Sequence, residues 1–128
     1  SGGLDSSLVA ALLQKCYDKP LNTFSIGLEG SPDIKYAKIV ADHIGSIHHE
    51  VIVTEKEMID AIEQDIYQIE TYDTTTIRAS VPMFLLSKYI KENRDNIDLI
   101  YIDCLLKHIP QTVIKRYVFY EAEVKMVI

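Results

Sequence analysis

Short segments rich in β-branched residues alternate along this chain with longer segments whose apolar residues repeat at helical spacing. Residues 21–28 (LNTFSIGL) and 47–53 (IHHEVIV) are of the first kind, and residues 6–17 and 32–44 are of the second. Two parallel strands cannot be joined by a tight turn and need a crossover connection, usually a helix. The alternation therefore predicts an α/β fold with a doubly wound, mainly parallel sheet covered by helices.

Local signals indicate where these helices begin and end. Asp5 or Ser6 can cap the first turn of the helix that starts the chain. Pro32 suits the first turn of the second helix, and Gly45 is expected to end it. Residues 54–57 form an S/T-x-x-E capping box, which predicts the start of a third helix that runs to about residue 70.

The second half of the chain is less regular. Residues 71–76 (TYDTTT) favour local hydrogen bonds and predict a loop, whereas Pro82 and the residues after it predict a helix from about Pro82 to Asn93. Residues 96–103 (NIDLIYID) predict a third strand. Residues 104–128 are apolar on too many faces for one amphipathic helix and suit a strand equally well, so they are left unassigned.

Composition narrows the class of protein. A chain of 128 residues, 48% hydrophobic, is typical of one globular domain, and a formal charge of −6 disfavours nucleic acid as a partner. Cys16 and Cys104 form no CxxC pair, which favours a reducing, cytoplasmic compartment. No apolar run reaches the ~20 residues that a membrane-spanning helix needs, so no membrane partner is expected.

The chain begins with SGGLDSS, residues 1–7, directly before the first helix. Adjacent glycines let backbone N–H groups approach an anion, and the helix dipole favours negative charge there. The loop matches neither GxxxxGK[ST] nor GxGxxG. Its one charged group is Asp5, and an aspartate beside a polyphosphate makes chemical sense if it binds Mg²⁺. The alternative is a glycine-rich turn with an ordinary Asp or Ser cap.

Three histidines lie close together in the sequence: His43, His48 and His49. Consecutive residues on a strand point to opposite faces, so His48 and His49 cannot easily share one ion. No cysteine or aspartate completes a zinc site beside them. We therefore interpret these histidines as structural or exposed.

Four motifs, in this order and spacing, resemble the synthetase domain of the glutamine-hydrolysing asparagine synthetases. They are SGGLDSS, FSIGLEGSPD at 24–33, HHE at 48–50 and IETYDTTTIRAS at 69–80. SGGLDSS is the signature of the wider ATP pyrophosphatase (PP-loop) family, whose fold is adenine nucleotide alpha hydrolase-like. The resemblance extends from Ser1 to about Asn93, and YDTTTIRAS is its most specific part.

The resemblance implies an activity: ATP and Mg²⁺ bind, aspartate becomes β-aspartyl-AMP with release of pyrophosphate, and ammonia from glutamine then gives asparagine. It also implies roles for individual residues. The nucleotide would be bound by Ser1, Gly2, Gly3, Asp5, Ser6, Ser7, Ile26 and Gly27, with Asp5 as the metal ligand. Aspartate would be bound by Thr75, Thr76 and Arg78. Asp5 and Arg78 would carry the catalytic step.

Three departures from the family pattern bear on activity. No strand precedes the glycine loop, Asp103-Cys104-Leu105 stands where the family has SGEGxDE, and no glutaminase domain with a nucleophilic cysteine is present. We therefore expect residues 1–128 to be part of a synthetase domain with a divergent tail at 104–128, and its parent protein to carry the glutaminase domain. The alternatives are a catalytically incompetent remnant that binds nucleotide weakly or serves for interaction, and another PP-loop ligase or amidotransferase.

Overall fold

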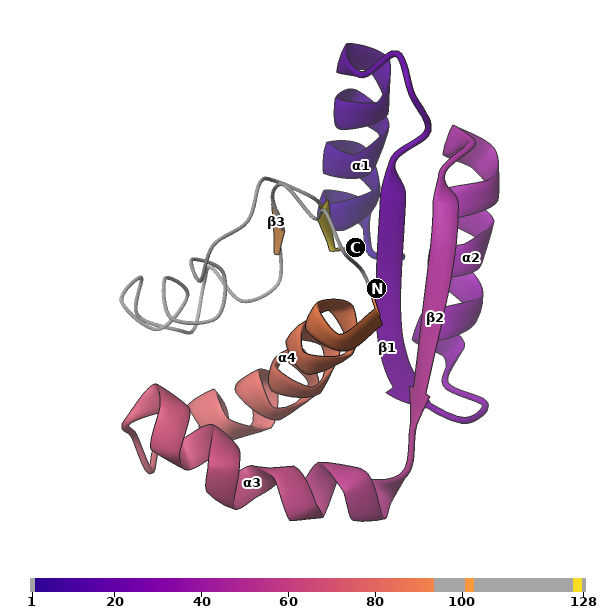
Figure 1. Ribbon diagram of the computed structural model, residues 1–128. Helices are drawn as coiled ribbons and strands as arrows, with labels where there is room; N and C mark the ends of the chain where they lie inside the picture. Colours follow the sequence, from indigo (N-terminus) through magenta and orange to yellow (C-terminus); the bar gives the residue numbers. More distant parts are fainter. Residues whose placement is uncertain (1, 94–100, 103–125, 128) are drawn as a thin grey trace.

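A computed structural model of the protein describes residues 2–93, 101–102 and 126–127 (Figure 1). In chain order its elements are α1 (Leu4–Cys16), β1 (Asn22–Leu28), α2 (Pro32–Ile44), β2 (Ile47–Val53), α3 (Glu55–Ile69), α4 (Thr74–Asn93), β3 (Tyr101–Ile102) and β4 (Met126–Val127). The predicted alternation of strands and helices is confirmed through residue 70.

β1 and β2 form a parallel pair joined by the crossover helix α2. The register runs from Asn22 opposite Ile47 to Leu28 opposite Val53. α2 contacts both strands, and α4 contacts β1. A Cβ at Gly27 would lie 3.1 Å from Cγ1 of Ile34, so α2 packs closely on the Gly27 face. Residues 2–93 thus form an α/β unit with a two-stranded parallel sheet, as expected for an incomplete doubly wound fold.

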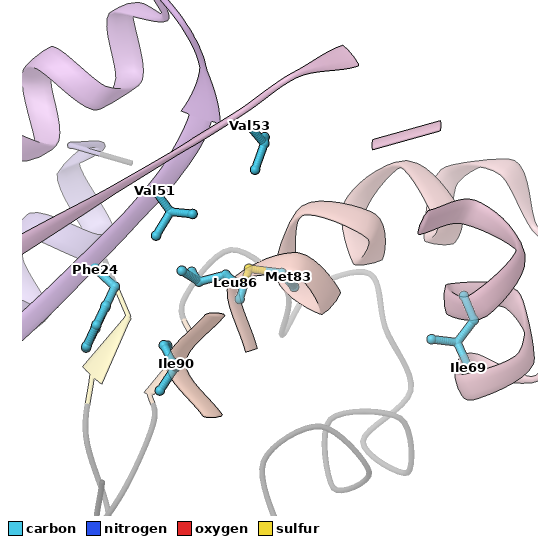
Figure 2. Close-up of a cluster of buried hydrophobic side chains, with 7 residues drawn as sticks. All are labelled: Phe24, Val51, Val53, Ile69, Met83, Leu86 and Ile90. Atoms are coloured by element: carbon cyan, nitrogen blue, oxygen red, sulfur yellow. The ribbon is translucent and has the colours of Figure 1, made fainter. Parts of the chain in front are cut away.

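The main hydrophobic core lies between the sheet and α4. Figure 2 shows Phe24, Val51 and Val53 of the strands facing side chains of α4, with Ile69 of α3 farther away. The α4 members of this cluster are Met83, Leu86 and Ile90. Phe24, Val51 and Val53 occupy alternate strand positions, so one face of the sheet is apolar. The opposite face carries Thr23, Ser25 and Gly27.

Predicted signals at the ends of α2 and α3 are confirmed. Pro32 opens α2, and Gly45 ends it in the left-handed conformation with φ of 72°. At α3 the Thr54 hydroxyl accepts from the Glu57 N–H at 3.2 Å, and the Glu57 carboxylate accepts from the Thr54 N–H at 2.7 Å. These caps depend on residues close together in sequence, which is why they are predictable.

The predicted cap of α1 is wrong. The N-cap position is Gly3, whose φ of −70° and ψ of 163° are extended, and no side chain caps it. Asp5 and Ser6 lie inside the first turn instead. The helix begins before either residue because Gly3 already makes the turn from loop to helix.

The predicted start of α4 at Pro82 is also wrong, because the helix begins eight residues earlier at Thr74. Asp73 caps it: one carboxylate oxygen accepts from the Thr76 N–H at 2.7 Å and from the Thr76 hydroxyl at 2.8 Å. Pro82 therefore lies inside the helix, where it provides no N–H donor. Its neighbours Val81 and Met83 are buried, and this packing supports the helix on both sides of the proline.

Predictions for the end of the chain fall mostly outside the described residues. Within the strand expected at 96–103, Tyr101–Ile102 is a strand and pairs in parallel with Met126–Val127. The remainder of 94–125 and residue 128 are not described. In the described part of the chain, no helix is both long enough and apolar enough to cross a membrane.

Candidate functional site

The glycine loop is held against the middle of α2. Gly2 has φ of +71°, which favours glycine, and a Cβ there would lie 2.5 Å from Cβ of Tyr36 and 2.8 Å from the backbone nitrogen of Ala37. Any larger residue at this position would collide with backbone and not merely with a flexible side chain. Gly2 therefore fixes the place of the loop, while Ser1 lies outside the described residues.

The hydroxyls of Ser6 and Ser7, near the start of α1, turn back toward Gly3. Ser6 Oγ donates to the Gly3 carbonyl at 3.1 Å, and Ser7 Oγ donates to the same oxygen at 2.6 Å. Each hydroxyl has one proton, so neither donates to a phosphate in this conformation. Their oxygens keep acceptor capacity, and a rotation about χ1 would redirect the protons toward a ligand.

Asp5 is exposed in the first turn of α1. Among the described residues, no group of three or more His, Cys, Asp or Glu side chains could hold a metal ion. Mg²⁺ in nucleotide sites is commonly bound by one or two carboxylates and by the phosphates themselves, with waters filling the remaining positions. A single exposed aspartate beside a helix N-terminus fits that mode of binding.

The second half of β1 carries the predicted nucleotide contacts Ile26 and Gly27. The Ile26 side chain is half-buried and packs against the core on the α4 face. Gly27 lies under α2, where its missing side chain admits Ile34. Close packing against Ile34 thus explains why position 27 is a glycine. The Ile26 side chain already packs in part against the hydrophobic core.

His48 and His49 point to opposite faces of the sheet, as the sequence predicts. His48 contacts the Thr23 and Ser25 hydroxyls at 2.9 and 3.0 Å. His49 stacks on Phe24 with ring centroids 4.7 Å apart and contacts Oδ1 of Asn22. Burial lowers the pKa of His48 below its ordinary value of 6.5, although Glu50 opposes this shift.

The predicted aspartate-binding residues lie on the first two turns of α4. Thr75 and Arg78 are exposed, and no ion pair is recorded for Arg78 within residues 2–93. Thr76 is buried and its hydroxyl is used by the Asp73 cap. The hydrogen bonds from Thr76 lower the pKa of Asp73, which keeps this carboxylate ionised. Sequence reasoning missed Asp73, although an aspartate three residues before a threonine is a recognisable cap signal.

A second missed residue, Asp65 of α3, is fully buried against α4. The Ser80 hydroxyl donates to its carboxylate, and Ser80 is also fully buried. Helical periodicity alone could not reveal this contact, because an aspartate in an amphipathic helix is normally on the solvent side. The pair joins α3 to α4 two residues beyond Arg78.

The structure brings together some of these residues and not others. The glycine loop and the face of β1 that carries Gly27 both lie against α2. In Figure 1 the last turn of α4 lies beside β1, whereas its first turn lies near the end of α3 and away from the glycine loop. Arg78 precedes the core residue Ile90 by twelve positions, or roughly 18 Å along the helix axis. The two groups are therefore separate in this structure.

Known proteins resemble the chain across this whole region. A sequence model of the asparagine synthase family matches residues 1–97. The asparagine synthetase [glutamine-hydrolyzing] of Gallus gallus is 55% identical over 102 residues, which cover 76% of this chain and 18% of the relative. The Homo sapiens protein of that name gives the same identity and coverage, and that of Triphysaria versicolor is 56% identical over 100 residues, covering 71% of this chain and 17% of the relative. This chain belongs to the asparagine synthase family.

Proposed function

We propose that this chain is the nucleotide-binding part of an asparagine synthetase domain, which uses ATP to convert aspartate to β-aspartyl-AMP and pyrophosphate before ammonia forms asparagine. The observation that carries the proposal is the start of α1. Two glycines lead into a helix that no side chain caps, within a region that matches the family. Other PP-loop ligases are not favoured, because the matching family is asparagine synthase.

The chemistry asks the glycine loop to stabilise charge on the departing pyrophosphate. Backbone N–H groups of the first turn and the helix dipole are suited to this, and they need no side-chain rearrangement during the reaction. Mg²⁺ bound through Asp5 would neutralise part of the phosphate charge. Ser6 and Ser7 could add donors once their hydroxyls turn away from the Gly3 carbonyl.

Arg78 suits the second substrate. A guanidinium binds a carboxylate or a phosphate through two parallel hydrogen bonds, and this one is exposed near a helix N-terminus. Thr75 lies one turn earlier and is also exposed. Thr76 would act indirectly, because its hydroxyl belongs to the cap that starts the helix.

The chain spans about 18% of the length of the curated relatives it matches. We propose that its full-length counterpart also contains a glutaminase domain that supplies ammonia, because those relatives are named as glutamine-hydrolyzing enzymes. A cytoplasmic location remains a prediction from the sequence, and the one described cysteine, Cys16, is an exposed free thiol.

The test is calorimetric titration of the purified chain with ATP, with and without Mg²⁺, beside Asp5→Asn and a matched control. Asp33→Asn is that control, because Asp33 is likewise an exposed acid in a first turn, that of α2. We expect Mg²⁺ to strengthen binding to the parent chain, and Asp5→Asn to abolish most of this gain. Asp33→Asn should bind as the parent does.

Two results would overturn the proposal. A folded chain that does not bind Mg·ATP would be the incompetent remnant, and equal binding by the parent and Asp5→Asn would remove Asp5 from the metal site. Circular dichroism of each protein shows whether it is folded. If binding is established, release of pyrophosphate on addition of aspartate then tests the adenylation step.

A further inference from the structure

A continuous chain of hydrogen bonds crosses the face of the sheet that α2 covers. It runs from the Ala41 carbonyl to Ser46 Oγ at 3.3 Å, then to Thr23 Oγ1 at 3.0 Å. From Thr23 it continues to Nδ1 of His48 at 2.9 Å, and Nε2 of His48 reaches Ser25 Oγ at 3.0 Å. Thr23 and Ser25 are almost completely buried, whereas Ser46 and His48 are partly buried, so water has little access to the two β1 hydroxyls.

Proton counting gives one consistent set of directions for these bonds. With Ser46 donating its one hydroxyl proton to the Ala41 carbonyl, which also accepts from the Gly45 and Ser46 N–H groups, Ser46 accepts from the Thr23 hydroxyl. Thr23 then has no proton left and accepts from Nδ1–H of His48. In a neutral imidazole the other nitrogen is an acceptor, so Nε2 accepts from the Ser25 hydroxyl. Burial, which lowers the pKa of His48, agrees with the neutral ring.

This chain of hydrogen bonds lies beside the elements of the proposed nucleotide site. Along α2, Ile34 contacts Gly27, Ala37 supports Gly2, and Ala41 ends the hydrogen-bond chain. The glycine loop thus contacts α2 at Ala37, between the position that packs on Gly27 and the position that ends the chain of hydrogen bonds. Ser25, the last member of that chain, directly precedes the predicted nucleotide contacts Ile26 and Gly27.

We propose that His48 is a positioning residue of the nucleotide site: as the neutral Nδ1–H tautomer it ties β1 to β2 through Thr23 and Ser25, and thereby holds residues 25–27 in place relative to the glycine loop. The inference rests on the proposed function for its ligand, ATP. His48 does not touch the nucleotide in this account, and its effect is transmitted through Ser25.

Protonation would break the arrangement. An imidazolium donates from both nitrogens, so Nε2 could no longer accept from Ser25. Among the described residues, the charges that act on the ring are Glu50, which favours protonation, and Lys38 and His49, which oppose it. Because the folded-state pKa is below 6.5, the stability that this arrangement contributes should be complete above about pH 6.5 and should decline as the pH falls from there toward the lowered pKa. ATP binding requires the neutral ring in the folded chain, so the affinity should decline only as the pH falls through the lowered pKa itself.

The first test uses the ¹⁵N-labelled parent chain without ligand. Imidazole ¹⁵N shifts at pH 7 should show His48 with a proton on Nδ1 and none on Nε2. His48→Leu should speed amide hydrogen exchange at residues 25–27 about tenfold relative to α3, as expected for the loss of one or two buried hydrogen bonds. An Nε2–H tautomer, an imidazolium at pH 7, or unchanged exchange would overturn the proposal.

The second test measures Mg·ATP affinity. His48→Leu should raise the Kd about tenfold. His48→Gln, a neutral amide with both a donor and an acceptor, should recover most of this loss and weaken the decline in affinity at acidic pH. His43→Gln, at an exposed position on α2, is the matched control and should change neither property.

The two tests separate failure of this inference from failure of the proposed function. If the parent chain does not bind Mg·ATP, the proposed function fails, and the tautomer and exchange data still decide the role of His48. If the parent binds but His48→Gln keeps the original pH dependence, His48 is not the group responsible and the inference is wrong.

Discussion

The first turns of α1 and α4 both carry residues with a predicted role in the site, and their backbone donors are treated differently. At α4 the Asp73 carboxylate accepts from the N–H and the hydroxyl of Thr76, so the helix start is closed by its own side chain. At α1 the cap is Gly3, which has no side chain to offer. A helix start whose cap residue is glycine forgoes the side-chain hydrogen bond that Asp73 provides, and residues 3–5 at the start of α1 are exposed on the surface, where an anion could approach. The comparison favours α1 as the phosphate-binding end.

The largest expected effect concerns the loop before α1. Gly2→Ala should destabilise the chain by about 3 kcal/mol, because it combines left-handed backbone strain with a collision against the α2 backbone. Gly30→Ala is the matched control: Gly30 also has a positive φ, of +77°, but nothing lies within 4 Å of its Cβ position. It should cost about 1 kcal/mol. Urea denaturation measures the free energy of unfolding of both variants. Equal losses would mean that the close approach of Gly2 to the α2 backbone does not contribute to stability.

An intermediate effect is expected at the closed start of α4. Asp73→Ala should lower the free energy of unfolding because it removes the cap of α4, whereas Asp73→Asn should retain most of the cap. Thr54→Ala, which removes the cap of α3, provides a scale for comparison. Thermal or urea unfolding with amide exchange at 74–78 is the measurement. If Asp73→Ala changes neither the free energy of unfolding nor the amide exchange at 74–78, the contrast between the starts of α1 and α4 does not hold.

The smallest effect is the acid sensitivity of the capped helices. Hydrogen bonds from Thr76 and Thr54 lower the pKa values of Asp73 and Glu57 below their ordinary 3.8 and 4.5. Their contributions to stability are therefore present above those values and are lost as the pH falls through the lowered folded-state pKa values. Asp73→Asn should weaken this acid dependence, which urea melts between pH 7 and pH 2.5 would detect. An identical profile in the variant would exclude Asp73 as a contributor.

Sequence patterns predicted the parts of the fold that depend on neighbouring residues. Pro32, Gly45 and the capping box at 54–57 bound their helices as expected, because each signal acts within one turn. The alternation of His48 and His49 also followed from strand geometry alone. Pro82 misled the prediction of α4, since packing of its buried neighbours outweighs the cost of an internal proline.

The site was predicted as a set of motifs, and the structure adds contacts that sequence spacing does not contain. Ser6 and Ser7 donate to the Gly3 carbonyl, and Thr76 serves a cap. Asp65 lies buried against Ser80 although its sequence position suggests an exposed acid. Such contacts join residues by tertiary packing, so a one-dimensional pattern cannot reveal them. The roles assigned to individual site residues therefore remain predictions.

The most direct test of the central claim is to follow the backbone amide shifts of the ¹⁵N-labelled chain during titration with Mg·ATP. We expect the largest changes at residues 2–7 and 25–27, and smaller changes at the capped start of α4, residues 74–78. Saturable shifts in that order would identify the uncapped start of α1 as the nucleotide-binding end. Largest shifts at 74–78, or at the capped start of α3, with the glycine loop unaffected, would contradict the account.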